Sequence, residues 1–315
     1  MKKFCALLTA LMLCHVWTFG QSAKYSSMVS ENRQRAVVEH LCDSLLEGRA
    51  AGTPGGKIAR DWVAHQFDSL LLKPFYYNRS QTFWSNGISM HNVLGVVPAL
   101  APSDKYVVVS AHYDHIGTLK GKFYPGADDN ASAVAALLSL AEMFSQMRRD
   151  SIGPGVNIIF AAFDGKQYSM AGSKHFVSSL PFAPAQILCE INLDIFGASL
   201  VPVHQRSDYL IVLGRNTLPE HLRNVVDRAN RAEGVNLDID YTFYGSDDFT
   251  RTMYKLGDHY PFAQKGIPAL LATSGFHQHT LKTTDTPEII DYPVLAKRTR
   301  LIFHIIELIA NGSNR

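Results

Sequence analysis

The sequence predicts one α/β domain, built on a mostly parallel central sheet with helices on both faces. Apolar runs such as residues 106–109 alternate with amphipathic stretches, which is the order of elements in βαβα folds. These runs lack polar alternation, so the strands are expected to be buried on both faces, as in a central parallel sheet. No repeat, low-complexity tract or linker divides the chain, and its length suffices for one domain with a substantial core.

The helices are expected where apolar side chains recur with the period of an α-helix. In residues 30–47, for example, Val37, Leu41 and Leu45 fall on one face. A turn rich in glycine and proline at residues 48–56 separates this helix from the next one. The other helices are expected near residues 58–70, 131–147, 172–180, 219–232 and 292–310.

The strands are expected where short apolar runs lie between turn signals. These runs occupy residues 92–98, 106–111, 156–163, 186–193, 209–213 and 267–273. Residues 198–257 are expected to add a cap or rim to the domain. Because ligands bind beyond the carboxyl ends of the strands in such sheets, polar residues directly after a strand mark the candidate site.

The first twenty residues have the pattern of a secretory signal. Lys2 and Lys3 form a charged start, and an apolar run from Phe4 to Trp17 follows. The run is short for a membrane anchor, so cleavage before Gln21 is expected. The predicted organisation is a signal peptide at residues 1–20 and one domain at residues 21–315, exported to the periplasm or the extracellular space.

The charge balance limits the classes of partner, and the cysteine content limits the possible disulfides. The chain has 30 Lys and Arg against 28 Asp and Glu, and two of the basic residues lie in the leader, so the mature chain is close to neutral. A near-neutral chain has no nucleic-acid footprint, and no later segment is long and apolar enough to span a membrane. Cys42 and Cys189 are expected to be buried free thiols, although export would permit a disulfide between them.

Five polar clusters follow expected strand ends or precede a helix. Zinc binds imidazole nitrogen and carboxylate oxygen, and a catalytic site keeps one position open for water. A lone histidine or aspartate in such a place is more often a cap or a solvated loop residue. Several clusters at one edge of a sheet favour a metal site instead. The clusters are residues 112–115, 126–132, 166–167, 192–194 and 277–279.

In these motifs the chain resembles the co-catalytic zinc aminopeptidases, whose clan also contains the glutaminyl cyclases. The resemblance covers nearly the whole mature chain, and the order and spacing of its motifs make it specific. The matching motifs are Gly48-Arg49 with Gly52, His112-Tyr113-Asp114, Gly126-Ala127-Asp128-Asp129-Asn130-Ala131-Ser132, Gly172-Ser173, Asn192-Leu193-Asp194, Asp258-His259-Tyr260-Pro261-Phe262, Gly266-Ile267-Pro268 and Asp285-Thr286-Pro287-Glu288.

The resemblance implies roles for four residues of this chain. His112 and Asp194 would bind one zinc ion, and Asp129 would bridge two ions. Asp114 is the candidate catalytic residue, since it would orient the His112 ring from behind the metal. The metal candidates are therefore His112, Asp129 and Asp194.

The other half of the family's site is replaced here. The family has a Glu-Glu pair, general base and zinc ligand, six and five residues before its Gly-Ser motif. Counted back from Gly172, these positions hold Lys166 and Gln167. The last histidine ligand, four residues before Asp285, corresponds to Leu281.

An ammonium group, such as that of Lys166, does not accept a proton at neutral pH unless burial strongly lowers its pKa. It also repels a metal ion, by roughly 4 kcal/mol per unit charge at about 4 Å and an effective dielectric near 20.

The sequence therefore predicts at most one zinc ion, in the half-site of His112, Asp129 and Asp194. One hypothesis is that the Lys166 ammonium takes the place of the missing ion and pairs with Asp129; the alternative is that it faces solvent. His279 is the candidate replacement for the lost histidine.

Two functions remain open. The first is an exported aminopeptidase-like metal hydrolase with impaired or altered chemistry. The second is a non-catalytic descendant that binds a peptide or another small molecule in the old cleft. Glutaminyl cyclisation fits less well, because its single-zinc site uses the glutamate and histidine positions that are replaced here.

Overall fold

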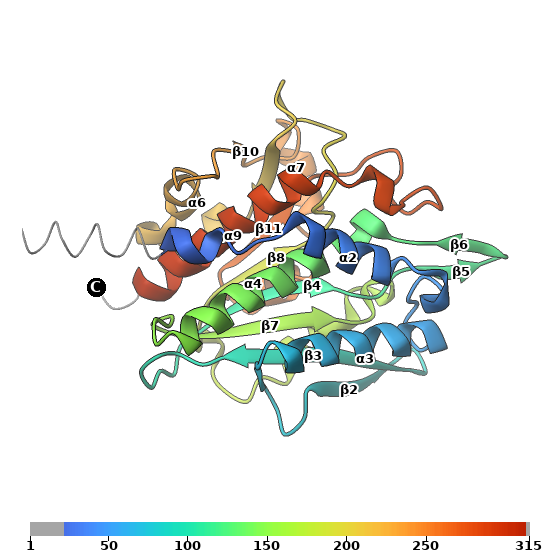
Figure 1. Ribbon diagram of the computed structural model, residues 1–315, viewed down its shortest axis with the longest axis horizontal. Coiled ribbons are helices and arrows are strands. Elements are labelled where there is room, and N and C mark those ends of the chain that lie inside the picture. The colour runs from blue at the N-terminus through green and yellow to red at the C-terminus, as the bar shows by residue number, and fades with distance from the viewer. Residues whose placement is uncertain (1–21, 313–315) are drawn as a thin grey trace, which may run out of the picture.

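The computed structural model describes residues 22–312, so the expected leader lies outside the described residues. A nine-stranded sheet runs through the domain (Figure 1) in the order β1-β3-β7-β4-β8-β11-β9-β10, with β2 also paired to β3. The strands are β1 (Lys73–Pro74), β2 (Ser80–Ser85), β3 (Ile88–Val97), β4 (Tyr106–His112), β7 (Asn157–Phe163), β8 (Ile187–Leu193), β9 (Tyr209–Leu213), β10 (Asp238–Asp240) and β11 (Ala269–Thr273). The hairpin of β5 (Gly117–Leu119) and β6 (Lys122–Tyr124) forms a separate small sheet.

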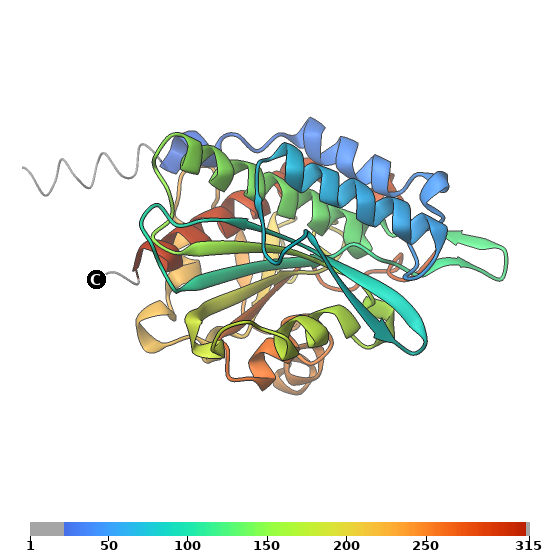
Figure 2. The same ribbon diagram turned by 90° about the horizontal axis from the view of Figure 1, so that it is seen from below.

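Helices cover both faces of the sheet (Figure 2), which confirms the predicted α/β class. On one face α2, α3, α4 and α9 pack together, and on the other face α5 packs against α8. The helices are α2 (Glu31–Leu41), α3 (Pro54–Ser69), α4 (Ser132–Arg149), α5 (Ala171–Ser178), α6 (Val225–Ala229), α7 (Asp247–Met253), α8 (Tyr260–Gln264) and α9 (Tyr292–Gly312).

The sheet is parallel in its centre and antiparallel towards both flanks. The neighbours β7, β4, β8 and β11 run parallel to one another. Strand β3 is antiparallel to β7, and β9 is antiparallel to β11. The parallel centre matters for function, because it brings the carboxyl ends of four strands to the same edge.

Local sequence signals explain where two of the helices begin. The Ser30 side chain accepts a hydrogen bond from the amide of Arg33 and caps α2. Thr53 caps α3 in the same way, and Pro54 occupies the first turn, where its missing N–H costs nothing. Helix α2 is shorter than the 30–47 helix expected from the sequence, because Asp43 accepts a bond from the Leu45 amide and starts a separate 3₁₀ turn.

The expected cap at residues 198–257 is wrong for most of that stretch. Strands β9 and β10 extend the main sheet, and α6 packs against α9. The stretch after β10 does lie beside the segment that follows β11, since the Phe243 and Phe276 rings are 5.9 Å apart. Residues 219–232, expected as one helix, form a 3₁₀ turn and the short α6.

Two further expectations can be compared with the described residues. Cys42 and Cys189 are both buried and free, as predicted. None of the helices between residues 22 and 312 has the length and apolarity needed to cross a bilayer.

Candidate metal centre

Three of the predicted site residues meet at the carboxyl edge of the sheet. His112 is the last residue of β4, and Asp194 directly follows β8. The parallel register pairs Ser110 with Asn192, so His112 and Asp194, two residues further along, are level. Asp129 lies in the turn before α4. The Asn130 side chain fixes that turn to β8, because it donates to the Leu193 carbonyl at 3.0 Å and accepts from the Ile195 amide at 3.0 Å.

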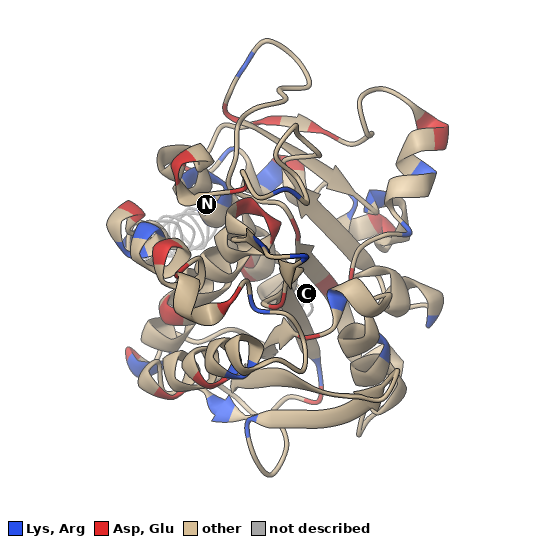
Figure 3. Ribbon diagram, turned by 90° about the vertical axis from the view of Figure 1, so that its right-hand side faces the viewer, with Lys and Arg blue, Asp and Glu red and all other residues tan. Residues whose placement is uncertain are grey.

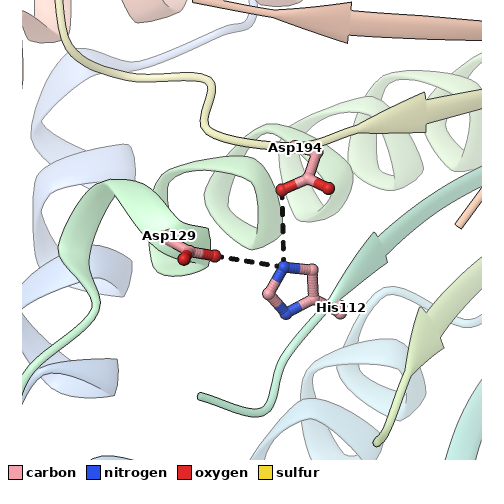
Figure 4. Close-up of side chains that lie close together, drawn as sticks. All are labelled: His112, Asp129 and Asp194. Carbon is pink, nitrogen blue, oxygen red and sulfur yellow. Dashed lines mark ion pairs between the residues drawn. The ribbon is translucent and has the colours of Figure 1, made fainter. Parts of the chain in front are cut away.

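The two carboxylates face the same ring nitrogen (Figure 4). His112 Nε2 lies 3.3 Å from Asp129 Oδ1 and 3.5 Å from Asp194 Oδ1. The three candidate ligand atoms all lie within 4.8 Å of one another. His112 is fully buried, yet its Nε2 has no hydrogen-bond partner. A buried nitrogen without a partner, facing two carboxylate oxygens, is the donor set that a zinc ion binds.

Each of the three side chains has a second contact behind this cluster. His112 Nδ1 donates to the backbone carbonyl of Asp114 at 3.0 Å. Asp194 Oδ2 forms an ion pair with the Lys166 ammonium. Asp129 Oδ2 lies 3.8 Å from His115 Nδ1. Burial lowers the pKa of His112, but the nearby carboxylates of Asp114, Asp129 and Asp194 outweigh it and raise the pKa well above its usual value.

Asp114 lies beside His112, but its carboxylate has another bond. Its oxygens accept the backbone N–H of Lys166 at 2.9 and 3.2 Å. The distance from Asp114 Oδ1 to His112 Nδ1 is 3.6 Å, longer than a hydrogen bond. The carbonyl of Asp114 therefore holds the imidazole, while its carboxylate fixes the start of the turn that carries Lys166.

Arg49 holds the loops of the site from below. Its fully buried guanidinium donates to the Tyr113 carbonyl at 2.9 Å, the Pro125 carbonyl at 2.7 Å and the Gly126 carbonyl at 2.9 Å. Tyr113 lies between His112 and Asp114, and Gly126 begins the turn of Asp129. The Arg49 side chain thus connects the loop that follows His112 with the turn that carries Asp129.

Lys166 points into the site, but its partner differs from the predicted one. Its side chain is only 14% exposed, and its Nζ contacts Asp194 Oδ2 and lies 3.7 Å from Asp258 Oδ2. The predicted ion pair with Asp129 is wrong, because the two oxygens of Asp129 face the imidazoles of His112 and His115. Burial lowers the pKa of Lys166, but Asp194 and Asp258 raise it above its usual value, so the side chain is a cation.

The other two replaced positions add nothing to the cluster. Gln167 is exposed, and its side chain has no hydrogen bond with the described residues. Leu281 is 48% exposed, with a φ of 59°. The His279 ring contacts the Thr284 hydroxyl at 2.9 Å and the Gln278 amide at 3.2 Å, so it does not take over the lost position. The described residues fit one metal ion, whereas Asp129 is the only one of the family's ligands for a second ion that this chain keeps.

Sequence reasoning singled out neither His115, which lies 3.8 Å from an oxygen of Asp129, nor Asp258, which lies 3.7 Å from the Lys166 ammonium. His115 is buried, neither ring nitrogen has a partner, and burial lowers its pKa to about 4. Asp258 accepts a hydrogen bond from the Ser173 hydroxyl at 2.5 Å. Both residues belong to motifs recognised in the sequence. Their places in the sequence did not indicate that His115 reaches Asp129 or that Asp258 reaches the Lys166 ammonium.

Aromatic side chains gather at the segment that follows β11. Tyr244, Phe249 and Phe276 are 39%, 39% and 42% exposed, and all three pack against Phe243. Tyr244 lies against Gly275, where a Cβ atom would be 2.2 Å from its hydroxyl. We call these four residues the aromatic cluster. On the edge of the sheet that Figure 3 faces, acidic and basic residues are interspersed, as expected for a nearly neutral chain.

Comparison with known proteins places the chain in a family. Residues 92–306 match the sequence profile described as "Peptidase family M28". The chain is 28% identical over 187 residues to a probable zinc metalloprotease of Pyricularia oryzae, covering 54% of this chain and 36% of that protein. It is 28% identical over 254 residues to the aminopeptidase YwaD of Bacillus subtilis, covering 79% of this chain and 48% of that protein. The chain thus spans less than half the length of these two relatives.

Solved structures have the same fold at low sequence identity. LapB of Legionella pneumophila superposes with a TM-score of 0.72 at 18% identity, over 92% of this chain and 75% of that one. The glutaminyl cyclase of Porphyromonas gingivalis superposes with a TM-score of 0.69 at 19% identity, over 89% of this chain and 98% of that one. At these identities the likeness concerns the fold alone.

Proposed function

The chain belongs to peptidase family M28, and from that premise we propose that it is an exported member without two-metal peptide hydrolysis. In this proposal the old cleft binds a peptide or another small molecule, with at most one metal ion. The single observation that carries the proposal is the Lys166 ammonium, ion-paired with Asp194 at the position where the family has its general base.

The chemistry of hydrolysis explains why this observation matters. A zinc ion held by His112, Asp129 and Asp194 would polarise a bound water or a carbonyl oxygen. A neighbouring group must then accept the proton of the water, and the ideal group has a pKa near the working pH. Lys166, with a pKa above its usual value, has no free lone pair for that step. Gln167 and Leu281 have no basic group either.

Ligand binding finds support in the aromatic cluster. Exposed apolar patches on soluble proteins frequently mark binding sites. The segment that carries Gly275 and Phe276 is hydrogen-bonded to the loop of the site, because Ser274, next to Gly275, donates to the carbonyl of Ile195, the residue after Asp194. An apolar side chain of a ligand would rest on these rings while its polar groups face the half-site.

A one-metal hydrolase is the second candidate function. The observation that favours it is the complete triad, in which His112 Nε2 is buried without a partner. In that case a bound water would need a base other than Lys166. The two candidates differ in turnover and in metal content.

Metal analysis of the purified protein is the direct test. We expect elemental analysis by mass spectrometry to find zero or one zinc ion per chain, and aminoacyl coumarin substrates to remain uncleaved. His112→Ala should abolish any zinc uptake, whereas His279→Ala should leave it unchanged. Two zinc ions per chain, with turnover that a chelator abolishes, would refute the proposal. One zinc ion with chelator-sensitive turnover would favour the one-metal hydrolase.

Export has its own test. We expect the protein secreted by its natural host, or by a bacterial host carrying the full sequence, to begin at Gln21. Intact-mass measurement of the secreted chain gives the cleavage position. A cell-associated chain that keeps residues 1–20 would contradict the expected export.

A further inference from the structure

We infer that Lys166 is an internal counter-ion of this site, which stabilises the metal-free protein and lowers the affinity of the triad for zinc. The inference rests on the proposed function, since it concerns the same half-site. It goes further in one respect: Lys166 favours the metal-free state of the site over the zinc-bound state.

Three buried aspartates lie at this site. Asp129, Asp194 and Asp258 are 5%, 8% and 1% exposed, and the first two face the same imidazole. Carboxylates this close and this poorly hydrated repel one another unless a cation lies between them. Among residues 22–312, Lys166 is the only lysine or arginine that pairs with any of the three.

Lys166 is fixed in place through both its backbone and its side chain. Its backbone N–H donates to both carboxylate oxygens of Asp114, which fixes the start of its turn. Ser173 binds one oxygen of Asp258 and leaves the other, Oδ2, without a hydrogen-bond partner 3.7 Å from the ammonium. The ammonium therefore lies within ion-pair distance of both Asp194 and Asp258.

Lys166 and a metal ion would compete for the Asp194 carboxylate. Asp194 has Oδ1 turned towards His112 and Oδ2 towards Lys166. An ion bound by the triad would share the Asp194 carboxylate with the ammonium, and two cations on one carboxylate repel each other. The ion would also find part of the negative charge of the site already neutralised. Removing the ammonium should therefore lower the stability of the metal-free protein and raise the affinity of the triad for zinc.

Lys166→Met tests both consequences, because methionine keeps much of the length and removes the charge. In excess chelator, we expect its melting temperature to fall by roughly 5–10 °C, as for a buried pair that loses one partner. In a competition titration with a fluorescent zinc chelator, we expect it to bind zinc roughly tenfold more tightly than the wild type, or better. Zinc should raise its melting temperature more than that of the wild type.

Lys174→Met is the matched control, since Lys174 is exposed on α5 and has no ion pair among the described residues. It should change neither quantity. Should Lys166→Met fail to fold, Lys166→Met with Asp194→Asn removes both charges and should recover stability; a double variant that also fails to fold would contradict the charge argument.

The outcomes separate this inference from the proposed function. An unchanged melting temperature in chelator and an unchanged zinc affinity in Lys166→Met would overturn the counter-ion inference, even when the wild type lacks turnover. Two zinc ions and chelator-sensitive turnover in the wild type would overturn the proposed function, whatever Lys166→Met does.

Discussion

Replacing Arg49 with methionine is expected to reduce the free energy of unfolding by about 3–5 kcal/mol. The guanidinium is fully buried, and it donates to the backbone carbonyls of Leu41, Tyr113, Pro125 and Gly126. Methionine would fill the space but leave these carbonyls without donors. Each buried acceptor without a partner costs about 1–3 kcal/mol, so the low end of the range needs only part of this set. Urea unfolding followed by circular dichroism measures the change.

Arg49 is also expected to matter for metal binding. Three of its partners, Tyr113, Pro125 and Gly126, lie in the loops of His112 and Asp129, so the variant should lose zinc affinity along with stability. Arg49→Lys keeps the charge but not the planar fork of donors. Its stability and zinc affinity should lie between those of the wild type and those of Arg49→Met. Arg231→Met, at an exposed position, is the control and should stay within about 0.5 kcal/mol of the wild type. An Arg49→Met protein as stable as that control would contradict the assignment.

Much of the sheet could be predicted because its strands are buried on both faces. The apolar run at residues 209–213 has the same bounds as β9, and the run at residues 106–111 is one residue shorter than β4. Strand β2 was not predicted, since Gln81 and Phe83 face inwards while Thr82 and Trp84 are exposed. The signal was present in the next residues: Asn86-Gly87, with φ of 50° and 76°, is a typical hairpin turn.

The location of the site could be predicted from the sequence, but the contacts between its side chains could be predicted less well. Residues directly after parallel strands must meet at one edge, which placed His112 near Asp194. Which acid Lys166 would choose depends on the orientation of each carboxylate. Asp129 faces two imidazoles, and Asp194 keeps one oxygen free for the ammonium. No spacing in the sequence encodes those orientations, because they are set by residues from four separate segments.

The variant that combines Lys166→Glu, Gln167→Glu and Leu281→His is expected to bind a second zinc ion. It removes the cation, supplies a carboxylate base and adds two ligands beside Asp129. Gln167 and Leu281 are exposed, so two of the changes should leave the fold intact. Histidine also suits the backbone at position 281, where φ is 59°, better than leucine does.

The triple variant should differ from the wild type both in melting temperature and in the number of zinc ions bound. Without metal, the triple variant has more buried negative charge than the wild type, so it should melt at a lower temperature. Zinc at about 100 times its dissociation constant should restore about 2.7 kcal/mol per site. Calorimetric titration and elemental analysis then count the ions. A well-folded triple variant that takes up a single zinc ion would count against the assignment of all three positions.

The double variant with Lys166→Glu and Gln167→Glu alone decides which residue supplies the missing nitrogen. If position 281 is the ligand position, the double variant should bind its second ion weakly, and Leu281→His should strengthen it. If His279 leaves its contact with Thr284 to bind the ion, the double variant should already bind tightly and lose that affinity on His279→Ala. We expect the first result, because the His279 ring has partners outside the triad and its backbone is two residues from the matching position.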